Sequence, residues 1–175
     1  ACVPTSPPAQ TSVPSAPKAP AISLIGTQAG QQWNGNGLDL PYCWSPPGTF
    51  QMGGLGGGNQ VQVTLTRGFW LGKCEVTQGE WRQLMGTTPW VGQESAVDRA
   101  DHAASYVSWT ESSAFCQKLT DQERQAGRLP EDWEFTLPTE AQWEYACRAN
   151  TNRRSCPSHC RPILGRLGFR QREAV

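Results

Sequence analysis

Three copies of one short pattern determine where helices can begin in this chain. In each copy a serine or threonine stands three residues before a glutamate or glutamine, as in a helical capping box. The copies are Thr77 with Glu80, Ser108 with Glu111, and Thr139 with Gln142. In such a box the hydroxyl oxygen accepts from a backbone N–H, and the longer side chain accepts from the backbone of the cap residue. The sequence therefore predicts three helices that begin at these positions.

The predicted helices also carry signals for how they are entered and where they end. The first and third are preceded by a hydrophobic staple, in the pairs Val76 with Trp81 and Pro138 with Trp143. Gly86 and Gly127 suit the left-handed position after the first two helices. The third helix is expected to end near Asn150, with an inner face made of Ala141, Tyr145 and Ala146.

A period-two alternation of apolar and polar residues predicts a β-hairpin upstream of the helices. Its apolar positions are Phe50 and Met52 in one strand and Val61, Val63 and Leu65 in the other. The glycine-rich stretch 53–59 is interpreted as a flexible loop between them. A phosphate-binding loop would need Lys and Ser or Thr after the last glycine, but Asn59 and Gln60 follow it here.

Composition divides the chain into three parts. Residues 1–31 begin with a run of Pro, Ser, Thr, Ala and Gln that cannot bury enough apolar surface to fold, and they are predicted to be a linker or tether. Residues 32–150 carry the periodic patterns and are predicted to form the globular domain. Residues 151–175 are rich in arginine and lack periodicity, so we expect a disordered tail.

Charge and hydropathy exclude some classes of partner. The 15 basic and 15 acidic residues balance, so no overall basic field favours nucleic acid. No apolar run approaches the roughly 18 residues that span a bilayer, and no transmembrane segment is predicted. The seven cysteines are odd in number and form no closely spaced disulfide pattern, which leaves the compartment open. A lipid-bearing Cys2, which would tether an exported bacterial protein to a membrane, is one alternative.

Few side chains have the spacing of a catalytic or metal site. Glu140 and Glu144 lie one helical turn apart and could divide acid and base roles, but a structural role is favoured, with Glu144 paired to Arg148. His102 has no second ligand at metal-binding spacing and is expected at the surface.

The cysteines are interpreted in the same way. The cluster of Cys156, His159 and Cys160 has no matching second pair and is taken as accidental. Free cysteines within strand or helix patterns usually behave as small buried hydrophobes, which is expected of Cys74, Cys116 and Cys147.

Four longer motifs carry a family resemblance. They are Pro46–Gly53, Val63–Gly79, Val107–Cys116 and Leu137–Ala146. In order and spacing they resemble the formylglycine-generating enzymes, or sulfatase-modifying factors, and Arg128–Phe135 is similar to bacterial members. The resemblance covers Trp44 to about Ala149. It implies an α+β, C-type-lectin-like fold with short strands, three capped helices and much irregular structure.

The resemblance also implies an activity. Complete members include oxidases that use oxygen and copper to convert a sulfatase cysteine to formylglycine, and they bind calcium. In those enzymes the copper-binding cysteine pair and the calcium ligands lie in the later half of the domain, to which nothing here corresponds. We therefore predict no catalytic, cofactor-binding or metal-binding residue in this chain. A sulfatase or other protein substrate is implied only for a completed domain.

After about Thr151 the resemblance stops, although Leu167–Arg170 is similar to the closing Gly-Phe-Arg of the family. A frameshift or internal deletion would explain the change, and it predicts an incomplete fold without its catalytic segment. Such a fold would expose strand edges that favour self-association. The alternative hypothesis is a noncatalytic lectin-like binding module on a flexible tether.

Overall fold

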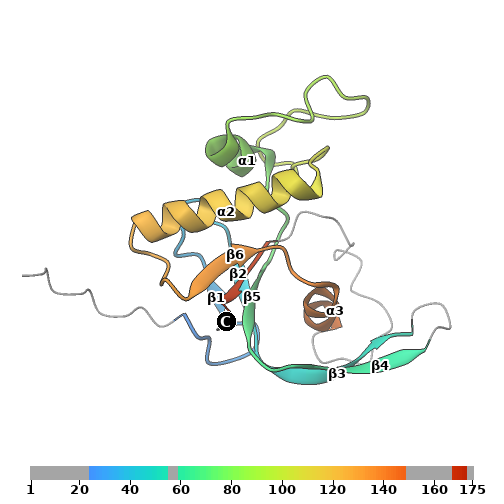
Figure 1. Cartoon of the computed structure of the whole chain (residues 1–175). Coiled ribbons are helices and arrows are strands. Elements are labelled where there is room, and N and C mark those ends of the chain that lie inside the picture. Colours follow the sequence, from blue (N-terminus) through green and yellow to red (C-terminus); the bar gives the residue numbers. More distant parts are fainter. Residues whose placement is uncertain (1–23, 55–58, 149–166, 173–175) are drawn as a thin grey trace, which may run out of the picture.

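The computed structural model describes residues 24–54, 59–148 and 167–172, which form an α+β fold around one antiparallel sheet (Figure 1). In sheet order its five strands are β1 (Gln32–Trp33), β2 (Tyr42–Ser45), β5 (Phe69–Gly72), β7 (Gly168–Gln171) and β6 (Trp133–Thr136). A separate hairpin pairs β3 (Gly48–Gly53) with β4 (Gln60–Leu65). The helices are α1 (Gln78–Met85), α2 (Trp109–Gln125) and α3 (Glu140–Arg148). In Figure 1, α2 and α1 lie on one side of the sheet, and α3 lies on the other with the hairpin.

All three predicted capping boxes are present. At the start of α1, Thr77 Oγ1 accepts from Glu80 N at 3.3 Å, and the Glu80 carboxylate accepts from Thr77 N at 2.6 Å. The helix ends at Gly86, whose φ of 72° is left-handed as predicted. Among the described residues, no helix is long and apolar enough to cross a bilayer.

The inner face of α3 differs from the predicted one. Its buried residues are Glu144 and Cys147, whereas Ala141, Tyr145 and Ala146 are half-buried. Sequence hydropathy could not anticipate a buried carboxylate, because its burial depends on partners from the distant β3 strand.

The predicted hairpin is confirmed, and the structure gives its register. Phe50 pairs with Val63 and Met52 pairs with Val61.

The turn between β1 and β2 is held by the side chain of Asn36. Its Oδ1 accepts from the backbone N–H of Leu38 and Leu40 at 3.1 and 3.0 Å. Such local bonds satisfy backbone groups that have no strand partner.

The C-terminal prediction is wrong for residues 168–171, which form β7 between β5 and β6. Phe169 on this strand is 0% exposed, and its ring centroid lies 4.8 to 5.7 Å from five other aromatic rings. These rings belong to Trp33, Tyr42, Trp70, Trp133 and Phe135. A four-residue strand with one aromatic side chain shows no periodicity, and its pairing partners are far away in sequence. Residues 151–166 and 173–175 of the predicted tail, including Cys156, His159 and Cys160, lie outside the described residues.

The folded domain also begins earlier than the predicted boundary at residue 32. Leu24 is 4% exposed, and its carbonyl accepts a hydrogen bond from Trp70 Nε1 at 2.7 Å. Gly30 N donates to the carbonyl of Trp44 at 2.9 Å. Residues 24–31 have too few apolar side chains to show a pattern, so only their packing reveals that they belong to the domain.

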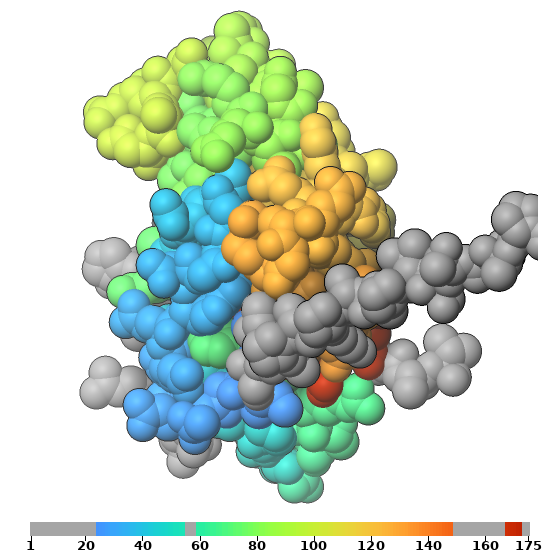
Figure 2. Space-filling model, turned by 90° about the vertical axis from the view of Figure 1, so that its left-hand side faces the viewer, coloured from blue at the N-terminus to red at the C-terminus, as the bar shows by residue number. Residues whose placement is uncertain are grey.

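A buried carboxylate joins this N-terminal region to α2. The Glu123 side chain is 1% exposed and accepts from Gly37 N at 3.0 Å and from Arg128 Nε at 2.6 Å. In Figure 2 the blue N-terminal segment and the orange end of α2 lie directly beside each other. Charge-assisted hydrogen bonds of this kind offset the cost of burying the carboxylate.

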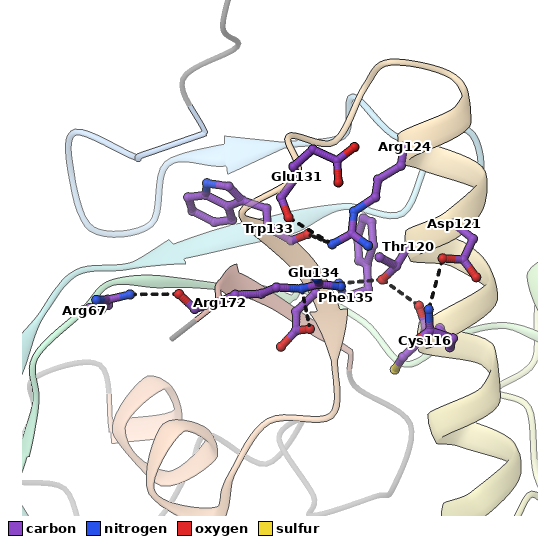
Figure 3. Close-up of polar contacts among 11 residues, drawn as sticks. Arg67, Cys116, Thr120, Asp121, Arg124, Glu131, Trp133, Glu134, Phe135 and Arg172 are labelled. Carbon is purple, nitrogen blue, oxygen red and sulfur yellow. Dashed lines mark hydrogen bonds and ion pairs between the residues drawn. The ribbon is translucent and has the colours of Figure 1, made fainter. Parts of the chain in front are cut away.

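Side chains of α2 cover the outer edge of β6 (Figure 3). Thr120 Oγ1 accepts from Phe135 N at 2.9 Å and donates to the carbonyl of Cys116 at 2.9 Å. Arg124 Nη2 donates to the carbonyl of Trp133 at 2.7 Å. Unpaired backbone groups on an edge strand can pair with another chain. On β6, the carbonyl of Trp133 and the N–H of Phe135 are already bonded to α2, so these two groups cannot do so.

Candidate functional site

The described cysteines lie on four different segments. Cys43 is half-buried on β2, and Cys74 is exposed just after β5. Cys116 on α2 and Cys147 on α3 are buried, as predicted. The expectation that Cys74 is buried is wrong, because β5 ends at Gly72 and the chain leaves the core there.

The Cys116 thiol is poorly suited to nucleophilic or metal chemistry. Burial raises its pKa from 9.0 to about 12. Thiolate is the reactive and metal-binding form, so at neutral pH only about one molecule in 10⁵ carries it. This thiol therefore acts as part of the core.

Glu144 links α3 to the hairpin. Its carboxylate pairs with Arg148, as the i,i+4 spacing predicts, and accepts from Gly53 N at 2.9 Å. Arg148 Nη2 in turn donates to the carbonyl of Gly53 at 2.7 Å. Glu140 is exposed in the first turn of α3. The partners of Glu144 tie it to the scaffold, in agreement with the structural role favoured for it.

Metal-ligating side chains are dispersed. His102 is exposed, as expected. Within residues 24–54, 59–148 and 167–172, no group of three or more His, Cys, Asp or Glu side chains could hold a metal ion. These residues therefore supply no such cluster for the copper and calcium that the family resemblance implies.

A polar hollow of about 440 Å³ lies where the end of β4, the start of α3 and strand β7 meet. Its lining residues are Thr64, Leu65, Thr66, Arg67, Gly68, Thr139, Gln142, Arg170 and Gln171. In Figure 2 the red C-terminal residues lie beside green atoms of the β4–β5 region. Among the described residues, the lining holds two arginines and neither aspartate nor glutamate, so these residues give it a positive charge.

Arg170 is the lining residue that sequence reasoning missed as a functional candidate. Its Nε is buried and has no hydrogen-bond partner in the described part of the chain. Glu134 stands opposite it in the β6–β7 pair, but its carboxylate accepts instead from Arg172 Nε at 3.2 Å (Figure 3). Arg67 Nη1 donates to the carbonyl of Arg172 at 3.0 Å. The Gly-Phe-Arg stretch was a signal for Arg170, but it does not indicate that Arg67 lies nearby.

Comparison with known proteins agrees with this fold. The structure is similar to that of PvdO from Pseudomonas aeruginosa, with a TM-score of 0.56 and 18% identity over 72% of this chain and 54% of that one. It is also similar to Treponema denticola variable protein 1, with a TM-score of 0.55 and 20% identity over 74% of this chain and 60% of that one. At these identities the likeness concerns the fold alone.

The sequence comparisons identify the family. A formylglycine-generating enzyme from Bos taurus is 30% identical over 96 residues, which are 55% of this chain and 20% of that protein. The chain thus spans about a fifth of the length of this curated relative. Residues 42–160, more than half of the chain, match the family described as sulfatase-modifying factor enzyme 1-like domain. The chain therefore belongs to the sulfatase-modifying factor family.

Proposed function

We propose that the described residues serve as a noncatalytic, lectin-like binding unit of this family and do not oxidise a protein cysteine by themselves. The placement of the thiols carries the proposal. Cys43, Cys74, Cys116 and Cys147 come from separate segments, and none of them belongs to a metal-holding group of three or more side chains within the described ranges.

The ionisable groups of the matched motifs support the same interpretation. A thiol that ionises only near pH 12 cannot supply thiolate at neutral pH, which argues against Cys116. A general base needs a carboxylate that can reach a substrate proton. Glu144 is instead engaged by Arg148 and by the backbone of Gly53.

A turnover assay tests the proposal. The purified protein is incubated with copper, oxygen and a cysteine-containing sulfatase peptide, and formylglycine in the peptide is measured by mass spectrometry. We expect no conversion above the protein-free control, whereas a complete formylglycine-generating enzyme converts the same peptide. Formylglycine produced by this chain would refute the proposal, and Cys43→Ser and Cys74→Ser variants would then show whether these thiols are used.

The match to the Bos taurus enzyme favours a second candidate function, oxidation of a sulfatase cysteine to formylglycine. In that case the reactive thiols and metal ligands would come from outside the described residues. The same assay separates the two functions, because only the second predicts copper-dependent conversion of the peptide.

A further inference from the structure

We propose that the hollow between β4, α3 and β7 binds the tetrahedral oxyanion of a small molecule, as a phosphate or sulfate ester, with Arg170 and Arg67 as its charged donors. The inference rests on the binding role proposed above and adds the chemical class of the ligand. No described residue of the lining is a cysteine, so binding at the hollow would not depend on thiol chemistry.

The described residues of the lining carry positive charge. Two guanidinium groups line the hollow, and no carboxylate is found among the lining residues that the structure describes. Glu134, the carboxylate that faces Arg170 across the strand pair, is bound to Arg172. Arginine presents up to five N–H donors in a planar fork, a geometry that matches oxyanions. An anion would thus find positive charge here that none of the described lining residues neutralises.

Arg170 also has a donor without a hydrogen-bond partner among the described residues. The buried Nε of Arg170 has no acceptor among the described residues, although buried polar groups are normally hydrogen-bonded. Arg67 uses Nη1 for the carbonyl of Arg172, which leaves donors on its other nitrogens. An oxyanion has several acceptor lone pairs, so it can accept from both of the guanidinium groups that line the hollow.

Neutral donors complete the lining. Gln142 Oε1 accepts from Thr139 N at 2.9 Å, so the acceptor end of this amide is occupied and its Nε2 donors remain for a ligand. Both residues lie at the start of α3, where the helix dipole favours negative charge. Thr66 adds a hydroxyl group to the same lining.

The size of the hollow argues for more than a bare ion. Small-molecule sites usually have volumes of about 300 to 1,000 Å³, and this hollow of about 440 Å³ falls within that range. The arginines would fix the oxyanion, and the remaining space would accept the organic part. Inorganic phosphate and sulfate are therefore minimal probes that test the charged end alone.

The experiment titrates the protein with phosphate or with sulfate at constant ionic strength, and isothermal titration calorimetry measures the heat of binding. Chloride is the nonspecific control. We expect saturable binding of at least one oxyanion, and the tighter one indicates which ester the hollow prefers. Arg170→Gln should weaken binding about tenfold or more, because it removes a charge-assisted hydrogen bond. Arg99→Gln is the matched control, since Arg99 is an exposed arginine paired with Asp101 outside the hollow.

Arg67→Gln keeps the test decisive if Arg170→Gln fails to fold, because Arg67 is exposed and lies outside the strands. It should also weaken binding, with unchanged near-ultraviolet circular dichroism. No saturable binding of either ion would overturn the inference, as would equal weakening by Arg99→Gln. A neutral ligand bound at the hollow without any oxyanion would overturn it too but leave the binding role intact. Formylglycine formation would refute the proposed lack of catalysis without affecting this result.

Discussion

Replacing Phe169 with alanine should destabilise the fold strongly. The side chain is 0% exposed and has five aromatic rings around it. Burying a phenylalanine removes roughly 150 to 200 Å² from water, which at about 25 cal/mol per Å² corresponds to about 4 to 5 kcal/mol. Measured core Phe→Ala substitutions cost about 3 to 5 kcal/mol. We therefore expect Phe169→Ala to lower the free energy of unfolding by about 4 kcal/mol.

Urea unfolding followed by tryptophan fluorescence measures this loss. Small domains are stable by only about 5 to 15 kcal/mol, so Phe169→Leu serves as a milder second variant, with an expected cost of about 1 kcal/mol. Val61→Ala is the control, because Val61 is 62% exposed on the hairpin and should change stability by no more than about 0.5 kcal/mol.

The refuting result is a small effect. If Phe169→Ala costs no more than Val61→Ala, then Phe169 does not lie at the centre of the aromatic core. The position of β7 between β5 and β6 would then be wrong as well.

Other predictions concern buried ionisable groups. Glu123→Ala should lower the free energy of unfolding in urea by about 2 kcal/mol, because it leaves Arg128 and the backbone N–H of Gly37 without their acceptor. The control Glu131→Ala changes an exposed side chain and should leave this free energy almost unchanged. Equal losses in the two variants would contradict the prediction. Iodoacetamide should modify exposed Cys74 quickly and buried Cys116 only when the fold opens, as measured by peptide mass spectrometry. Equal labelling rates of the two thiols would show that Cys116 is accessible. Because burial raises the folded-state pKa of Cys116 from 9.0 to about 12, the unfolded state loses this proton first. The free energy of unfolding should therefore fall as pH rises from about 9 to about 12, and less steeply in Cys116→Ala.

Sequence reasoning succeeded where the interacting groups are close in the chain. The capping box of Thr77 and Glu80 joins residues three positions apart, and the hairpin follows from period-two alternation on two strands that are close in the chain. The pair of Glu144 and Arg148 likewise follows from helical spacing. Each of these features needs only local geometry, so the sequence was sufficient to predict it.

It failed where distant segments supply the partners. β7 has four residues, and its stability comes from β5 and β6 on either side and from the rings around Phe169. Leu24 likewise enters the core through contacts with later parts of the chain, including Trp70. The hollow could not be foreseen for the same reason, because Arg67 and Arg170 come together only in the folded sheet.

Amide hydrogen exchange of residues 167–172 tests the account most directly, because β7 carries both Phe169 of the core and Arg170 of the hollow. The measurement compares this segment with β5 by mass spectrometry of the purified protein under native conditions. Hydrogen bonds to two neighbouring strands should slow exchange in β7 to the rate seen in β5. Exchange in β7 at the rate of an unstructured peptide, with β5 still protected, would contradict the account.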